Sequence, residues 1–458
     1  LVRNYGLASG AVQTHLDNVI GAGLRLSAKP DYRALGMDVD QAADWARDTE
    51  SAFFQWAYDV DKGCDAGRRL NFAGMLGQGY RSYLTRGEIF AVAEWLPERS
   101  SGYATTIQMV GSERVSNPNY LMDGKRLRAG VALDDHGAAV AYHVRGDSGP
   151  GLVGQQEWKR IDAYTAWGRR QVLHIYDQEE AGQTRGKSNF SAVLAKMKML
   201  SRFESVTLEA AVINSMFAAV IESDMGNVTE ALGSGPGENS DLKLYANEQD
   251  QYGSSERIDF GGANIVPLLP NEKLRMVTPE HPSSNFDPFE QSFLRQLAGG
   301  LNLSYEQLSR DYSKTNYSGA RAGLLESWKF FQGRRQMIGG ELGTQIYALW
   351  LEEAMDRGIV SHPPGTPDYY EAKTAWTRCK WIGPGKSHID PLKEGKADAL
   401  ALDRGFMTLE QACADRGLDL EEVLDQRARE VKMIEERGLA LPGSIADVLG
   451  GPAEPETA

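Results

Sequence analysis

Apolar residues recur at helical spacing near the start of the chain. They repeat every three to four positions from Thr14 to Ile20 and from Ala42 to Tyr58, with Asp38 or Asp40 placed as a helix cap. From Ile89 to Val144 the pattern changes to short β-rich runs separated by turn sequences. The sequence therefore predicts a helical start followed by a small antiparallel β unit.

Three long helices are predicted in the second half of the chain. After one more strand at 171–176, helical periodicity runs from Phe190 to about Ser223 and again from Phe286 to Leu303. A polar break from Ser309 to Ser318 separates the second of these helices from a third, which is predicted from Gly319 to about Arg357. This mixture of elements predicts an α+β protein.

The segment 224–285 differs in composition from its surroundings. It is rich in Gly, Pro, Ser and Asn, and its main strand candidate lies at 263–269. We expect it to protrude or to be mobile. Two further helices are predicted near 409–416 and 420–437.

Composition narrows the classes of function. At 458 residues the chain is long enough for two or three domains. Its 49 basic and 63 acidic residues give a net charge of −14, which excludes an all-over basic nucleic-acid binder. Any contact with DNA must then be local or non-adhesive. The longest apolar run, Ala210 to Ile221, is too short for a transmembrane helix, so no membrane partner is expected.

Catalytic and metal-binding signals are weak. The three cysteines are widely spaced, and no pair of histidines has the i, i+4 spacing of two ligands on one helix face. The sequence predicts no metal site, no cofactor and no catalytic residues. One motif leaves an alternative open, because residues 181–188 (Ala-Gly-Gln-Thr-Arg-Gly-Lys-Ser) match a relaxed phosphate-binding loop in which Lys187 would contact a nucleotide. The alternative interpretation of residues 181–188 is a polar turn that leads into a helix.

Several stretches resemble one protein family. The start of the chain, residues 15–24, Gly130 to His143 and above all Leu301 to Arg321 are similar to the lambda-type bacteriophage portal proteins, and the resemblance covers nearly the whole chain. It implies a portal fold with an α/β wing, long stem helices, a small α/β clip and a helical C-terminal crown. The implied parts are the wing at 1–187, a stem helix at 188–222, the clip at 223–285, a second stem helix at 286–308, a tunnel loop at 309–318, the wing helix and C-terminal part of the wing at 319–400, and the crown with its tail at 401–458.

The resemblance also implies a function. Portal proteins of this family form a ring of about twelve copies at one vertex of the capsid, so the expected location is the virion, after assembly in the cytoplasm of the host bacterium. Such a ring is not an enzyme. It nucleates head assembly, docks the terminase large subunit for DNA packaging and allows DNA ejection. The implied partners are the major capsid and scaffold proteins, the head-completion proteins and double-stranded DNA that passes without sequence reading.

Two candidate sites follow from this interpretation. The tunnel loop would place polar side chains toward DNA, where a ring repeats each charge around the bore. The clip has four basic and ten acidic residues, a net charge of −6, which suits a charge-steered contact with terminase. The DNA-facing candidates are Arg310, Asp311, Tyr312, Lys314, Asn316 and Tyr317, and the terminase-facing candidates are Glu230, Glu238, Asp241, Glu248, Asp250, Glu256 and Asp259.

Overall fold

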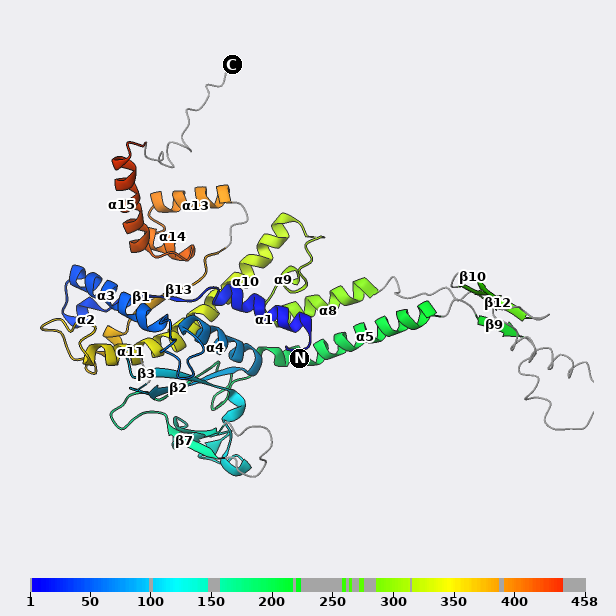
Figure 1. Cartoon of the computed structure of the whole chain (residues 1–458), viewed down its shortest axis with the longest axis horizontal. Helices are drawn as coiled ribbons and strands as arrows, with labels where there is room; N and C mark the ends of the chain where they lie inside the picture. Colours follow the sequence, from blue (N-terminus) through cyan, green and yellow to red (C-terminus); the bar gives the residue numbers. More distant parts are fainter. Residues whose placement is uncertain are drawn as a thin grey trace, which may run out of the picture. The chain divides into compact units, whose positions relative to one another are not determined.

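The computed structural model describes residues 2–98, 102–146, 157–216, 220–223, 258–260, 263–265, 272–275, 286–313, 315–386 and 391–439. The chain forms two compact units, one made of residues 1–194 with 294–458 and one made of residues 195–293. The helices are α1 (Gly6–Val19), α2 (Tyr32–Leu35), α3 (Val39–Ala57), α4 (Phe72–Arg86), α5 (Leu194–Met216), α8 (Phe286–Gly300), α9 (Tyr305–Ser309), α10 (Tyr317–Met337), α11 (Thr344–Asp356), α12 (Lys373–Trp376), α13 (Pro391–Asp403), α14 (Leu409–Asp415) and α15 (Leu420–Glu436) (Figure 1).

In the part of the chain that the structure describes, the strands form five small sheets, and every named strand pair is antiparallel. The larger unit contains β1 with β13, a three-stranded sheet in the order β3-β2-β8 and a four-stranded sheet in the order β4-β5-β6-β7. The smaller unit contains the pairs β9–β12 and β10–β11. The strands are β1 (Arg25–Ala28), β2 (Glu88–Trp95), β3 (Thr105–Val110), β4 (Leu127–Arg128), β5 (Val131–Leu133), β6 (Ala139–Arg145), β7 (Trp158–Asp162), β8 (Val172–Tyr176), β9 (Val220–Ser223), β10 (Ile258–Phe260), β11 (Ala263–Ile265), β12 (Glu272–Arg275) and β13 (Cys379–Ile382).

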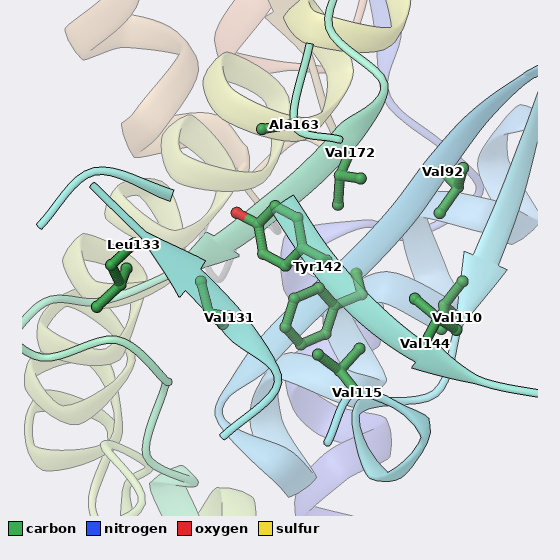
Figure 2. Packing of buried hydrophobic residues seen from close by; sticks show 10 residues of the cluster. Val92, Val110, Val115, Val131, Leu133, Tyr142, Val144, Ala163 and Val172 are labelled. Atoms are coloured by element: carbon green, nitrogen blue, oxygen red, sulfur yellow. The ribbon is translucent and has the colours of Figure 1, made fainter. Parts of the chain in front are cut away.

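One apolar core joins the three-stranded and four-stranded sheets. Phe90 of β2 contacts Tyr142 of β6 edge to face, with 5.8 Å between ring centroids. Figure 2 shows this packing from close by. Alternate residues of β2, β5 and β6 point into the cluster, and the opposite face of β2 is buried as well. Its members are Phe90, Val92, Val110, Val115, Val131, Leu133, Tyr142, Val144, Ala163 and Val172.

A second core is aromatic and lies where α3 meets α11. The ring of Phe53 contacts Phe72, Tyr347 and Trp350 edge to face, with centroids 5.2 to 5.7 Å apart. The sequence predicted α3, and Asp38 caps it with a full capping box. This core fixes α3 against the interior of the larger unit.

The third long helix is continuous, as predicted, but its middle is wider than an α-helix. Residues Ile338–Gly343 form a π-helical segment between α10 and α11. A Cβ atom at Gly339 would lie 2.8 Å from the side chain of Trp381, and one at Gly343 would lie 2.9 Å from it. Only glycine lets β13 approach the helix this closely, and the π segment lies at that contact.

The predicted helix at 190–223 is wrong at its end. Helix α5 stops at Met216, and Val220–Ser223 forms β9, which pairs with β12. Val220 and Ile221 are β-branched and favour the extended conformation once a partner strand is available. Of the predicted strand at 263–269, Ala263–Ile265 is β11, and 266–271 lies outside the described residues.

Two observations bear on the organisation of the chain. The smaller unit, 195–293, lies inside the predicted stem and clip segment 188–308. Helix α13 runs across the boundary predicted at residue 400. Within the described residues, no helix has the length and apolar character that crossing a membrane requires.

Candidate functional site

The helix predicted from Phe286 to Leu303, or to 308 as a stem helix, stops at Gly300, and a separate short helix, α9, precedes the predicted polar break. Helix α9 begins at a capping box, in which Ser304 Oγ accepts a hydrogen bond from Gln307 N at 3.2 Å and Gln307 Oε1 accepts one from Ser304 N at 3.0 Å. The helix ends at Arg310, whose backbone is left-handed with φ of 57°. The irregular segment between α9 and α10 is therefore 310–316.

Asp311 organises this segment from within. Its carboxylate accepts hydrogen bonds from Ser313 N at 3.0 Å, from Ser313 Oγ at 2.6 Å and from the hydroxyl of Tyr305 at 3.3 Å. Its own backbone N–H donates to Ser309 Oγ at 3.2 Å. Asp311 is consequently a structural residue of the loop.

The far end of the loop is also anchored. Thr315 Oγ1 donates to the Glu306 carboxylate at 2.9 Å, and Asn316 caps α10 by accepting from Gly319 N at 2.7 Å. Burial disfavours the Glu306 charge, but hydrogen bonds from its own backbone N–H, Thr315 and Ser304 outweigh this and lower the pKa of Glu306. The loop thus has a fixed course at both ends.

The predicted tunnel-loop residues divide into two groups. Arg310 and Tyr312 are exposed, with 56% of Tyr312 accessible, and they are the described side chains of the set that are free to meet a ligand. Asp311 and Asn316 are used in the hydrogen bonds that shape the loop. Lys314 lies outside the described residues, and Tyr317 is the first residue of α10.

The predicted clip residues are described only at one point. Asp259 lies in β10, where it pairs with Asn264 of β11. The other six lie outside the described residues: Glu230, Glu238, Asp241, Glu248, Asp250 and Glu256.

A cluster of ionisable side chains surrounds Arg185, which comes shortly before α5 in the chain. Arg185 donates to the carboxylate of Glu88, with its closest contact at 2.6 Å. The same guanidinium reaches three backbone carbonyls, those of Ser112 at 2.9 Å, Val115 at 2.8 Å and Ala129 at 2.5 Å. Arg185 therefore joins β2 to the segments that enter the four-stranded sheet. We call Arg185, Glu88 and His174 the arginine cluster.

The charges of this cluster are strongly coupled. Burial opposes the ionised form of Glu88, yet hydrogen bonds from His174 at 3.2 Å and from Arg185 outweigh it and lower the pKa of Glu88 to about 2. Burial also lowers the pKa of His174, and the contact with Glu88 opposes that shift. No sequence pattern predicted this cluster, because Glu88 and Arg185 are 97 positions apart.

The motif at 181–188 forms a turn beside the arginine cluster. Gly186 N donates to Glu88 Oε2 at 3.1 Å, and Lys187 Nζ donates to Glu179 at 3.4 Å. A one-turn 3-10 helix, Asn189–Ala192, follows, so the motif does not open directly into a long helix. Its N–H and ammonium groups face carboxylates, where a phosphate-binding loop would leave them free for phosphate.

Comparison with known proteins decides between the portal and nucleotide-binding interpretations. The family model described as "Phage portal protein, lambda family" matches residues 1–335. The "Portal protein" of Escherichia phage N15 is 38% identical over 451 residues, covering 97% of this chain and 85% of that protein. This chain belongs to the lambda family of phage portal proteins.

Other relatives of this portal chain agree with that assignment. "Portal protein B" of Escherichia phage lambda is 36% identical over 460 residues, covering 97% of this chain and 84% of that protein. The "Probable portal protein" of Halomonas phage phiHAP-1 is 25% identical over 455 residues. The function is therefore that of a phage portal protein, and the comparisons give no support to a nucleotide-binding enzyme.

Solved structures that match this chain come from gene transfer agent particles. The neck of an empty particle has a TM-score of 0.49 and 12% sequence identity, and the neck of a native particle computed with C12 symmetry has a TM-score of 0.48 and 12% identity. Each match covers 91% of both chains.

In the part of this portal chain that the structure describes, no group of three or more His, Cys, Asp or Glu side chains could hold a metal ion.

Proposed function

We propose that this chain is one subunit of a ring of about twelve copies that encloses the DNA channel at a capsid vertex. The family assignment supports a portal function, and the surface of α5 supports assembly with further copies. As a non-enzymatic component, the ring would nucleate head assembly, dock the terminase large subunit and release DNA at ejection.

The apolar surface of α5 is the observation that supports the ring proposal. Phe203 stacks on Phe286 of α8 at 5.5 Å between centroids and also contacts Phe289 at 4.9 Å. Leu208 and Val212 lie roughly 140° and 180° around the helix from Phe203, at about 100° per residue. They are 67% and 51% exposed. A helix that is apolar on opposite sides needs cover on both, and α8 covers the side of Phe203.

The ring proposal is tested by the size of the purified protein. Analytical ultracentrifugation and negative-stain images should show a closed ring for the wild type and loss of that ring for Leu208→Asp combined with Val212→Asp. Glu209→Ala, an exposed polar position on the same helix, is the matched control and should assemble normally. A wild-type protein that stays monomeric at micromolar concentration and physiological salt contradicts the proposal.

The named parts of the portal fold belong to the same proposal. The smaller unit at 195–293 supports a stem and clip that are distinct from the wing, and the anchored course of 310–316 supports a loop that holds its shape in a bore. We assign 223–285 to terminase contact and Arg310, Tyr312 and Lys314 to DNA. Flanking acidic residues would keep DNA affinity low enough for movement.

The remaining partners follow from a place at the capsid vertex. They are the major capsid and scaffold proteins and the head-completion proteins, with assembly in the host cytoplasm. DNA would pass without base reading, because phosphate contacts position a duplex and base contacts specify it.

A further inference from the structure

A loop of the larger unit presents three consecutive apolar side chains to solvent. Tyr120 ends the one-turn 3-10 helix Pro118–Tyr120, and Leu121 and Met122 follow it before β4. The three residues are 70%, 60% and 92% exposed. We call residues 120–122 the apolar knob. Single exposed apolar residues are ordinary on a protein surface, but three in a row on one loop form a patch.

Polar contacts behind the knob fix its shape. Asn117 Nδ2 donates to the carbonyl of Leu121 and to Asp123 Oδ1, both at 2.8 Å. Asn117 Oδ1 accepts from Gly130 N at 2.6 Å, and Asp123 Oδ1 accepts from Ala129 N at 2.8 Å. The loop is closed by these bonds before any partner arrives.

The backbone of the knob is also in a costly conformation. Asn119 and Tyr120 have φ of 50° and 58°, in the left-handed region, which Asn tolerates but a bulky residue such as Tyr rarely adopts. The ring of Tyr120 lies edge to face with Trp158, at 5.6 Å between centroids. Strain of this kind persists where the surroundings enforce it, and it is concentrated at functional sites. A rigid knob loses little conformational entropy on binding.

The segment around the knob has a positive net charge, although the whole protein is acidic. Segment 112–130 contains four basic residues and two acidic ones, a net charge of +2, while the whole chain carries −14. Lys125 and Arg128 are exposed. The partner of the knob should therefore combine an apolar pocket with an acidic rim.

The same unit also carries such a pocket, lined by other residues. A cavity of about 780 Å³ lies among the end of β2, α11 and the loops around residues 165–171 and 362–370. Its rim includes Trp95, Trp167 and Tyr370, which are 54%, 66% and 51% exposed. Aromatic side chains of this kind are the commonest strong contacts of protein interfaces. The volume lies within the range of pockets that accept compact ligands, about 300–1,000 Å³.

The charge of this cavity complements the knob. Arg169 is the one Arg or Lys that lines it, and that guanidinium is already engaged by Glu352 at 3.4 Å and by Thr105 Oγ1 at 2.7 Å. The acidic residues that line the cavity are Glu94, Glu352, Glu353, Asp356 and Asp368.

We propose that the apolar knob of one copy of this chain inserts into the aromatic cavity of the next copy, with Lys125 and Arg128 facing the acidic rim. The two surfaces are different patches of one chain, which is what a head-to-tail contact in a ring requires, since a two-fold dimer would pair a patch with itself. The inference rests on the ring proposed above and names the surfaces that would join its subunits.

Cysteine cross-linking tests the contact directly. Met122→Cys combined with His362→Cys, which lines the cavity, is treated with a short bismaleimide after ring formation. Each chain then carries both halves of the contact, so the expected product is a ladder of covalent oligomers larger than dimers. Met122→Cys with Val60→Cys, an exposed position away from the cavity lining, is the matched control and should stay mostly monomeric on a denaturing gel.

Charge reversal provides a second test. Lys125→Glu with Arg128→Glu should reduce the yield of rings about tenfold, and Glu94→Lys with Asp356→Lys should do the same. A chain with all four changes should recover assembly, because the two signs are exchanged together. The control Lys159→Glu with Arg160→Glu alters basic residues on β7 and should assemble like the wild type.

The outcomes separate this inference from the ring itself. Wild-type rings without a ladder from the Met122 and His362 pair would overturn the knob contact and leave the ring standing. Cross-linking of Met122→Cys alone that stops at dimers would mean that knobs meet each other, which also overturns it. A monomeric wild type would remove the ring and the contact together.

Discussion

The imidazole Nε2 of His15 donates a hydrogen bond to the carbonyl oxygen of Leu301, at 2.9 Å and across 286 positions of sequence. The ring is buried between Phe330 and Phe331, and its Nδ1 lies 3.4 Å from the hydroxyl of Tyr80. Because Leu301 lies in the turn that leads into α9, His15 connects α1 to the segment that precedes the proposed tunnel loop.

Acidification should weaken this connection. Burial lowers the pKa of His15 to about 4, the hydrogen bond to Leu301 opposes this, and Arg334 adds to it. The unfolded chain binds a proton to this residue at about pH 6.5, so the stabilising contribution of His15 is complete above that pH and is lost as the pH falls to 4. We expect the free energy of unfolding to drop by up to roughly 3 kcal/mol over that range. Urea titrations at several pH values should show a shallower drop for His15→Gln. An unchanged pH profile in that variant would contradict the assignment.

Removing the guanidinium of the arginine cluster should be strongly destabilising. Arg185→Met leaves the Glu88 carboxylate buried beside His174 and removes three carbonyl contacts, which we expect to cost about 3–5 kcal/mol. Arg86→Met is the matched control, since its pair with Glu113 is exposed and worth less than about 1 kcal/mol. Denaturant unfolding of the two variants measures the difference. Equal losses of unfolding free energy in the two variants would show that the arginine cluster stabilises the fold no more than an exposed ion pair does.

Reversing the charge of the tunnel loop should impair DNA handling without affecting assembly. In a ring, Arg310 and Lys314 become belts of charge near the phosphates, so Arg310→Glu with Lys314→Glu should leave rings and procapsids intact but reduce packaging or retention of DNA. The defect should depend on salt if the contact is direct. The control Lys329→Glu changes an exposed residue of α10. Full heads that keep their DNA in the double variant would show that the loop does not act on DNA.

Shortening the clip should separate assembly from packaging. Deletion of 229–260 removes seven of the ten acidic residues of 223–285, which are all seven candidates for terminase contact, and leaves β9 and β12 in place. Rings should still form, and packaging should be abolished. Terminase pull-down with wild-type and shortened rings measures the contact. Normal packaging by the shortened protein would exclude this segment as the docking surface.

Local patterns predicted much of the fold. The short β-rich runs of β2, β3, β6 and β8 and the apolar spacing of α3 were sufficient, because β-branched and aromatic runs favour strands and a helical repeat favours a helix. The short helix α9 was missed although Ser304 and Gln307 have capping-box spacing. The end of α5 was wrong because β9 depends on a partner strand some fifty residues away.

For the candidate sites, too, the sequence predicted local features but not contacts between distant segments. Composition picked out the break near 310, and the exposure of Arg310 and Tyr312 agrees with a surface role. Local sequence could not reveal that Asp311 is occupied inside the loop, or that Glu88 and Arg185 meet. Contacts between distant segments follow from packing, and no periodicity encodes them.

The pairing of β1 with β13 has a consequence for synthesis of the protein. Residues 25–28 leave the ribosome long before their partners at 379–382. At about 5–20 residues per second the wait is roughly 20–70 s. Throughout that time β1 presents an unpaired edge, which invites association with other nascent chains. A chaperone that shields this edge until residue 382 has emerged would raise the yield of correctly folded subunits.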